Sequence, residues 1–291
     1  MQRAPVAAVV IAYHPPAAIL QNIAALAAQV SHVVVVDNTP GSNGTGVLHD
    51  LEHSTDCTVI HNGKNLGIAA ALNIGIRHAV AQGFSWILTM DQDSRVSDGY
   101  VEAMLVGYEE AASHLHVGML CPRYLDSRLN IEIPKLRAAN GEIAGCMTSG
   151  SMIEASTFEL LGPFEETLFI DYVDYEYCVR MRLSGFKIVE CRDAVLLHSL
   201  GRITVHRILG RELPVTNHNP KRRYYIHRNR LVLIRRYFWK DRDWALTELK
   251  GLMFDSAMVL FFEDHKTAKA GYMLRALYDG MLNRLGQQVP L

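Results

Sequence analysis

The sequence predicts an α/β fold: a Rossmann-like, doubly wound mixed sheet with helices on both faces and further helices toward the C-terminus. Short runs rich in Val and Ile, such as Val6–Ala12 and residues 33–36, are bounded by polar residues, Pro or Gly. Such runs are typical of strands buried on both faces of a parallel sheet. Segments with helical spacing of apolar residues alternate with them, and this order indicates strand–helix–strand units.

The expected elements follow one another at short intervals. The first half should contain a strand at Val6–Ala12, a helix over 17–30 opened by Pro15-Pro16, a strand at 33–36, a helix near 47–54, a strand at Cys57–His61, an Ala-rich helix over 67–82 and a strand at 86–90. Beyond residue 120 the pattern is mixed, with a helix start in the acidic-aromatic run 171–178. From Tyr224 onward helical periodicity dominates, interrupted near 240–243.

Length, composition and charge exclude several classes of protein. The chain has 291 residues, 49% of them hydrophobic, so it can bury a large core, and its formal net charge of -1 favours neither a nucleic-acid binder nor an acidic tail protein. Five dispersed cysteines without a Cys-x-x-Cys pair argue against a disulfide framework or zinc knuckle and fit a reducing cytoplasm. No apolar run reaches the roughly 18 residues that span a bilayer. Any membrane contact is therefore expected from the surface, on the inner face of the plasma membrane.

Polar residues gather directly after the expected strands. Ligands of doubly wound sheets bind beyond the carboxyl ends of the strands, so these positions are candidates for a nucleotide site. They are Tyr13, Asp37 with Asn38, the four residues at 62–65, and Asp91-Gln92-Asp93. For Asp37 two interpretations stay open. In the first, its carboxylate accepts a hydrogen bond from an N–H of the nucleotide base or from a ribose hydroxyl. In the second, it only initiates a turn through hydrogen bonds to its own backbone.

Asp91 and Asp93 suggest a cation site. Side chains two apart in extended backbone project to the same side, so the two carboxylates converge. A divalent cation such as Mg²⁺ or Mn²⁺ commonly accepts one or two protein carboxylates, while substrate phosphates and water complete its shell. The alternative is a solvated loop whose Asp caps a helix over 94–101. The position after an interior strand favours the cation site.

Small residues at 65–75 lie at the start of the Ala-rich helix. Backbone can approach a ligand closely there, and the helix dipole favours phosphate. Tight packing of the helix on the sheet would use the same small residues, so both interpretations stand.

Taken together, these residues resemble the inverting family-2 glycosyltransferases of the GT-A fold, and within them the rhamnosyltransferase group. The resemblance runs from residue 6 to about residue 236. It rests on an ordered series of motifs: Val-Val-Asp-Asn at 35–38, Asn65-Leu-Gly with Ala70, Ala71 and Asn73, the pair Asp91 and Asp93, Ser149-Gly150-Ser151, the run 169–180 with Gly185, and His198.

The resemblance implies a domain plan and a reaction. Residues 1–236 would form the GT-A domain, with a nucleotide-sugar half over about 1–120 and an acceptor half over 121–236, and residues 237–291 would be a helical extension packed on it. The donor would be a nucleotide sugar, with dTDP-L-rhamnose as first candidate. The acceptor would be a hydroxyl of a surface-glycan or lipid-linked saccharide.

Donor-side residues carry over from the family to matching positions. Asp37 would bind the base, Asn65 and Gly67 would lie near the nucleotide, and Asp91 with Asp93 would hold the diphosphate through a divalent cation. Tyr13 is expected on the same side because it follows the first strand. His198 follows the apolar run 194–197, and in the family a His here contacts metal or diphosphate, with a purely structural role as the alternative. Arg202 is a candidate diphosphate contact, since guanidinium recognises phosphate oxygens in a forked geometry.

Asp174 matches the family's general base. Direct displacement at an anomeric carbon needs a base on the acceptor side and charge stabilisation at the leaving diphosphate on the opposite side. A Glu often precedes this Asp in the family, whereas Val173 stands here, so Asp171 or Glu176 are alternatives that share the role. The other interpretation of the acidic cluster is an N-terminal charge set on the helix through Arg180, which explains Glu176 well. The expected acceptor contacts are Ser149, Gly150, Asp171, Arg228 and Asn229.

Residues 221–240 interleave basic and aromatic side chains and contain no carboxylate. Contact with anionic lipid or with a lipid-linked diphosphate acceptor is the first interpretation, and a core-packing helix is the second. No nucleic-acid motif accompanies the basic residues, so RNA is not expected as a partner.

Two other functions compete with inverting transfer of a deoxyhexose. In a haloacid-dehalogenase-like phosphatase Asp91 would be a covalent nucleophile, but that motif usually opens its domain and here it follows three expected strands. The second alternative is a non-catalytic subunit that binds nucleotide sugar. A dehydrogenase is disfavoured because the turn at 13–16 lacks a Gly-x-Gly-x-x-Gly loop.

Overall fold

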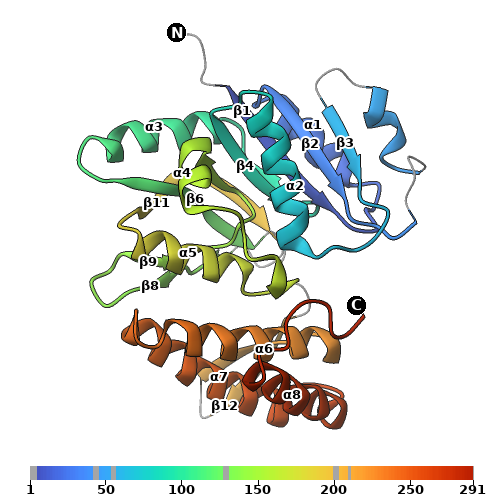
Figure 1. Ribbon diagram of the computed structural model, residues 1–291, viewed down its shortest axis with the longest axis vertical. Coiled ribbons are helices and arrows are strands. Elements are labelled where there is room, and N and C mark those ends of the chain that lie inside the picture. Colours follow the sequence, from blue (N-terminus) through green and yellow to red (C-terminus); the bar gives the residue numbers. More distant parts are fainter. Residues whose placement is uncertain are drawn as a thin grey trace. The chain divides into compact units, whose positions relative to one another are not determined.

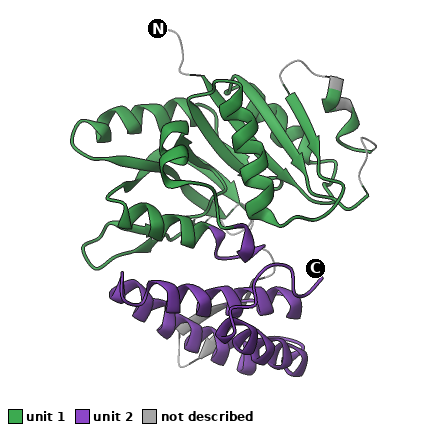
Figure 2. Ribbon diagram, in the orientation of Figure 1, with its two compact units in different colours: residues 1–165, 174–199 green, residues 166–173, 200–291 purple. Residues whose placement is uncertain are grey.

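A computed structural model of the chain is shown in Figure 1. It describes residues 5–41, 46–53, 57–126, 131–198, 203–208 and 211–290. Contacts divide the chain into two compact units, residues 1–165 with 174–199 and residues 166–173 with 200–291 (Figure 2). The division of a GT-A domain from an extension at residue 236 stays a prediction.

The central sheet belongs to the first unit and is mixed. Its strands lie in the order β3-β2-β1-β4-β10-β6-β11-β5, with β7 paired to β6. The bounds are β1 Val6–Ala12, β2 His32–Asp37, β3 Cys57–His61, β4 Trp86–Asp91, β5 Arg95–Val96, β6 Val117–Asp126, β7 Glu132–Ile133, β10 Ser151–Glu154 and β11 Lys187–His198. Strands β3, β2, β1 and β4 are parallel, whereas β10 is antiparallel to both β4 and β6. The expected doubly wound mixed sheet is confirmed.

Burial explains why the first strands could be read from the sequence. All seven residues of β1 and five of the six in β2 are buried, so both faces of the sheet are covered and no polar alternation appears. A Cβ on Gly75 would lie 2.4 Å from Cγ1 of Val9 and 2.9 Å from Cγ2 of Val36. The absence of a side chain at Gly75 therefore lets helix α2, Ile68–Ala81, lie directly on β1 and β2.

The remaining elements of the first unit surround this sheet (Figure 1). They are α1 Ile19–Ala27, η1 His49–His53, α3 Tyr100–Ala112, β8 Leu136–Arg137, β9 Ile143–Gly145, α4 Ala155–Leu161 and α5 Val173–Leu183, whose first residue is assigned to the second unit. The alternative helix over 94–101 is wrong: β5 occupies its middle, and α3 begins only at Tyr100. No Asp of the pair therefore caps a helix there, and Ser94 is 1% exposed rather than part of a solvated loop.

The second unit combines a two-stranded ribbon with three helices. Its elements are η2 Glu166–Leu168, β12 Ile203–Ile208, β13 Arg211–Thr216, α6 Pro220–Tyr237, α7 Arg242–Phe262 and α8 Lys266–Met281. The break expected near 240–243 separates α6 from α7, where the side chain of Asp241 accepts from the backbone N–H of Trp244 and caps α7. Among the described residues no helix is both long and apolar enough to cross a bilayer.

Helix α6 contains most of the basic segment 221–240, and most of its residues are buried. Glu263 accepts from Arg223 and from Lys269 of α8, whose ammonium lies 2.8 Å from the Glu263 carboxylate. All three side chains are no more than 6% exposed. Arg230 pairs in the same way with Glu248 and Asp255 of α7. The lipid-facing interpretation of this segment is therefore wrong for these arginines, and the core-packing alternative describes them.

Candidate active site

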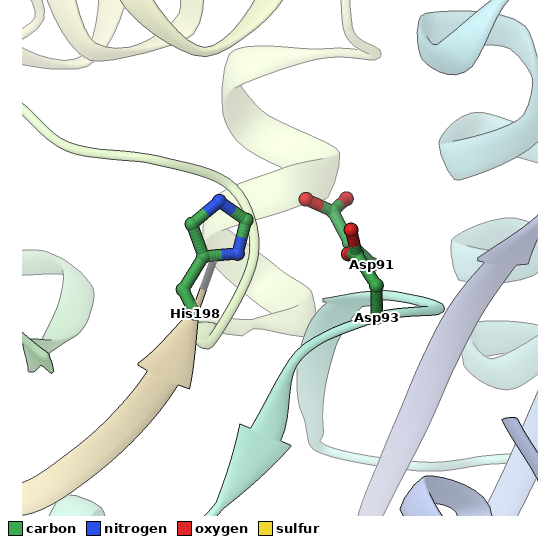
Figure 3. Close-up of side chains that lie close together, drawn as sticks. All are labelled: Asp91, Asp93 and His198. Atoms are coloured by element: carbon green, nitrogen blue, oxygen red, sulfur yellow. The ribbon is translucent and has the colours of Figure 1, made fainter. Parts of the chain in front are cut away.

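The two aspartates and the histidine singled out above meet beyond the ends of two strands. Asp91 ends β4, Asp93 lies in the following loop, and His198 ends β11. Their candidate ligand atoms all lie within 4.8 Å of one another, and Figure 3 shows the imidazole facing both carboxylates. Ligands on opposite sides of Mg²⁺ are about 4.2 Å apart, so small adjustments would bring these atoms onto one cation. The two carboxylates are the kind of ligand that suits Mg²⁺ or Mn²⁺.

Two buried serines connect Asp91 to His198. The backbone N–H of Asp91 donates to Oγ of Ser149 at 3.0 Å, and that hydroxyl donates to Oγ of Ser94 at 3.0 Å. Oγ of Ser94 lies 2.9 Å from Nδ1 of His198. Ser94 and Ser149 are each 1% exposed, so water does not compete for these bonds. The chain of hydrogen bonds fixes the carboxyl end of β4 relative to His198.

This serine chain is also compatible with the tautomer that a metal ligand needs. A neutral imidazole that binds a cation through Nε2 must carry its proton on Nδ1. Oγ of Ser94 can accept from that Nδ1–H, in the manner in which a metal-binding His usually donates its other N–H. Sequence reasoning missed Ser94, whose partners are 55 and 104 residues away.

Gln92, between the two aspartates, holds the same loop from the other side. Its amide makes two bonds with the backbone of Tyr13: Tyr13 N–H donates to Oε1 at 2.8 Å, and Nε2 donates to the Tyr13 carbonyl at 3.1 Å. The carbonyl of Gln92 accepts from Nδ2 of Asn22 in α1. Tyr13 thus lies beside the acidic loop, as its position after the first strand predicts.

The expected base-binding carboxylate is buried and already oriented. Asp37 is 2% exposed. Its Oδ1 accepts from the backbone N–H of Thr39 at 3.0 Å, and its Oδ2 lies 3.0 Å from Nδ1 of His61. Nε2 of His61 in turn lies 2.8 Å from Glu52. The alternative in which Asp37 initiates a turn therefore applies to Oδ1, which accepts from Thr39. A contact between Asp37 and the nucleotide base remains a prediction.

The side chain of Asn38 forms hydrogen bonds along the loop before α2. Its Oδ1 accepts from Nδ2 of Asn62 and from the backbone N–H of Leu66, and its Nδ2 donates to Asn65 Oδ1 and to the carbonyl of Gly67. Gly67 has a φ of 87° at the start of α2, a value that suits glycine. The loop that is expected to approach the nucleotide is therefore preformed.

The small residues expected at the acceptor site are used mainly within the scaffold. Ser149 takes part in the serine chain described above. Gly150 has a φ of 79°, and a Cβ there would lie 2.7 Å from the hydroxyl of Tyr100. That hydroxyl donates to the carbonyl of Gly150 at 2.5 Å. A side chain at 150 is excluded by the packing between β10 and α3.

Asp174 is the second residue of α5 and is half-buried. Its Oδ1 accepts from the backbone N–H of Tyr175 at 2.9 Å. Glu176 is 2% exposed and pairs with Arg180 at 2.8 Å, so the helix-charge interpretation describes it. Asp171 pairs with Arg222 at 3.0 Å. Of the three acidic side chains, Glu176 is the one committed to a buried ion pair.

The other expected phosphate or acceptor contacts differ in their surroundings. Arg228 and Asn229 are both 0% exposed and donate to backbone carbonyls of the second unit. Their side chains are therefore used in packing. Arg202 lies outside the described residues.

Comparison with known proteins identifies the relatives of this site. The profile described as Glycosyl transferase family 2 matches residues 7–149, which include Asp37, Asp91 and Asp93. The chain is 32% identical over 248 residues to the dTDP-rhamnosyl transferase RfbF of Shigella flexneri, covering 79% of each chain. It is 29% identical to the galactofuranosyltransferase GlfT1 of Mycobacterium tuberculosis, covering 77% of this chain and 80% of GlfT1.

Solved structures agree on the fold. TarS of S. aureus superposes with a TM-score of 0.64 at 15% identity, covering 96% of this chain and 49% of TarS. TarS 1-349 in complex with UDP-GlcNAc gives a TM-score of 0.62 at 15% identity, covering 98% of this chain and 82% of that one. The fold is GT-A, and the phosphatase alternative has no support. The identity and coverage shared with RfbF, together with the profile match across the nucleotide half, show that the chain belongs to glycosyl transferase family 2.

Proposed function

We propose that this glycosyltransferase moves L-rhamnose, with inversion, from dTDP-L-rhamnose to a hydroxyl of a surface-glycan or lipid-linked saccharide. The observation that carries the proposal is the meeting of Asp91, Asp93 and His198 at the strand ends of a chain that is similar to a dTDP-rhamnosyl transferase. The sugar and the nucleotide are inferred from that similarity. The catalytic residues are inferred from their types and positions.

The roles follow from charge and position. Asp91, Asp93 and His198 would hold a divalent cation, Mg²⁺ or Mn²⁺, which when bound neutralises charge on the diphosphate leaving group. Asp37 would accept a hydrogen bond from the base, while Asn65 and the helix start at Gly67 would face the phosphates. Arg202 would add a guanidinium contact to the diphosphate.

Asp174 would take the proton of the acceptor hydroxyl as that oxygen attacks the anomeric carbon. The bond from this carbon to the diphosphate oxygen breaks in the same step, so the configuration inverts.

A donor screen tests the proposal. Binding of TDP, UDP and GDP with Mn²⁺ or Mg²⁺ is measured by calorimetry, and transfer from dTDP-L-rhamnose and from UDP-galactofuranose is followed by mass spectrometry. We expect preference for TDP, transfer of rhamnose, and a product of opposite anomeric configuration to the donor. Preference for UDP with transfer of galactofuranose would replace rhamnose by the sugar named for GlfT1, and donor binding without any transfer would reject the enzyme assignment.

We also propose peripheral contact with an anionic membrane, located on α7 and α8 rather than on α6. Exposed apolar side chains lie at helical spacing on each helix: Met253, Phe254 and Phe261 on α7, and Leu274, Tyr278 and Met281 on α8, each at least 53% exposed. Along 266–290 Lys266, Arg275 and Arg284 are exposed, whereas the one carboxylate of that segment, Asp279, is 4% exposed. Apolar and basic groups together favour anionic lipid.

Vesicle sedimentation tests this contact. Vesicles that contain phosphatidylglycerol should bind the protein, and binding should weaken with salt and in a Phe261→Ser, Leu274→Ser variant. Equal binding to neutral phosphatidylcholine vesicles, or concentration-dependent dimerisation abolished by the same variant, would show that the face serves another partner.

A further inference from the structure

The four residues before α5 have an unusual backbone. Phe169, Asp171 and Tyr172 have φ values of 68°, 60° and 66°, in the left-handed region that bulky side chains rarely adopt. Helix α5 begins at the next residue, Val173, and Asp174 follows. The conformation of 169–172 therefore sets the direction in which the chain enters the helix that carries Asp174. Strained backbone of this kind persists only where its surroundings over-determine it.

Asn229 supplies most of that restraint. Its Nδ2 donates to three carbonyls of the segment, those of Leu168 at 2.9 Å, Ile170 at 2.8 Å and Asp171 at 2.9 Å. Its Oδ1 accepts from Nε of Arg228 at 2.9 Å. An amide has its donors and its acceptor on opposite sides, so the bond from Arg228 directs Nδ2 toward the carbonyls.

Arg228 also contacts the segment itself. One terminal nitrogen donates to the carbonyl of Leu168 at 2.9 Å, and the other donates to the carbonyl of Gly286 at 2.6 Å. The guanidinium lies over the ring of Tyr225, 4.9 Å from the centroid, and that ring packs against Phe169 at 5.3 Å between centroids. With 0% exposure, the side chain is committed to this packing and does not present its charge to a ligand.

Side chains of the segment are held by the same helices. The hydroxyl of Tyr172 donates to Glu248 at 3.0 Å, and Glu248 accepts from Arg230 at 2.7 Å. The carboxylate of Asp171 pairs with Arg222. Carbonyls and side chains of the segment are thus restrained from both α6 and α7.

We propose that Arg228 and Asn229 are positioning residues: they hold the segment 168–172, in which Phe169, Asp171 and Tyr172 are left-handed, in the conformation from which α5 and Asp174 start. This differs from the acceptor contact expected from the sequence. The proposal rests on the proposed role of Asp174 as the base. A misplacement of about 1 Å in a reacting group costs up to about 100-fold in rate, so a buried amide remote from the substrate has a measurable effect.

The test compares Asn229→Ala with Ser256→Ala. Ser256 is half-buried on α7, and its hydroxyl donates to the carbonyl of Leu252 at 2.7 Å and lies 3.3 Å from Nε2 of His227. Both variants lose hydrogen bonds inside the second unit. We expect Asn229→Ala to lower kcat at least tenfold with the affinity for TDP and Mn²⁺ unchanged, and Ser256→Ala to keep kcat within twofold. Equal kcat in wild type and Asn229→Ala, or equal losses in both variants, would overturn the proposal.

A double-mutant cycle separates positioning from acceptor contact. If Asn229 acts through Asp174, the Asn229→Ala, Asp174→Asn double variant should be no slower than Asp174→Asn alone. Losses that multiply would show that Asn229 acts by another route. Should Asn229→Ala fail to fold, Arg228→Lys keeps the charge and removes the fork, and it should reproduce the kcat loss. Full activity of Asp174→Asn would instead reject the base assignment itself, which distinguishes that failure from failure of the positioning role.

Discussion

Replacement of Ser94 by Ala tests whether the serine chain orients His198 for a cation. The substitution removes the oxygen that lies 2.9 Å from Nδ1 of His198 and 3.0 Å from Oγ of Ser149. At 1% exposure, water cannot readily replace the lost hydroxyl. His198 would keep its place at the end of β11 but lose the hydrogen-bond partner that orients its ring.

The magnitude follows from what is lost. Removal of a residue that orients a metal-binding His typically costs 10–100-fold in metal affinity, or about 1.4–2.7 kcal/mol. The carboxylates of Asp91 and Asp93 are untouched, so binding should weaken rather than vanish. At saturating Mn²⁺ the rate should return to within about threefold of wild type, because the metal affinity is what the substitution lowers.

Calorimetric titration of Mn²⁺ in the presence of TDP measures this effect. Ser97→Ala is the matched control: Oγ of Ser97 accepts from the backbone N–H of Val195 in the same strand, β11, at 3.3 Å, without touching His198. The control should bind Mn²⁺ like wild type. Unchanged affinity in Ser94→Ala, or a Ser94→Ala, His198→Ala double variant much weaker than His198→Ala alone, would refute the reasoning.

Three further outcomes are expected. Asp93→Ala, or chelation with EDTA, should abolish transfer while the thermal midpoint of the ligand-free protein stays within a few degrees; transfer that persists would reject a metal role. Gly75→Ala should lower the free energy of unfolding by about 1–3 kcal/mol through overpacking against Val9, whereas Gly271→Ala, with nothing within 4 Å, should raise it by up to about 1 kcal/mol; denaturant titration compares them. Burial, with Arg222, Arg223 and Lys269 nearby, lowers the pKa of His218 from 6.5 to about 3. Between pH 6.5 and 3 the unfolded chain therefore binds a proton at His218 that the folded chain does not bind. The free energy of unfolding should fall on acidification through this range, by up to about 1.4 kcal/mol per pH unit. His218→Gln should flatten that dependence, and an equally steep curve for the variant would contradict it.

Fully buried strands and strand-end chemistry could be predicted from the sequence. β1 matches its predicted bounds because an unbroken apolar run between turn residues leaves little freedom in where a buried strand begins. β3, an edge strand that is mostly half-buried, also matches its predicted bounds. Asp91 and Asp93 were found because parallel strands bring their carboxyl ends to one edge of the sheet. The metal role of His198 was predicted from the resemblance to the family.

Residues whose role depends on distant partners could not be predicted in this way. Nothing in the sequence near Ser94 indicates that it lies between Ser149 and His198. The basic segment of α6 suggested a charged surface because its neutralising carboxylates, Glu248, Asp255 and Glu263, lie 18 to 40 residues further along the chain. Local charge pattern cannot tell an ion pair inside a helical bundle from a solvated face.

The buried carboxylate of Glu263 has a consequence for how relatives of this protein can diverge. Two cations, from α6 and α8, share that single anion. Loss of Glu263 would therefore leave two buried cations without a counter-charge and destabilise the fold by about 3–5 kcal/mol, whereas loss of either cation would leave a neutral pair. Homologues that lack the carboxylate at position 263 should therefore also lack the cations at 223 and 269, while either cation alone can change.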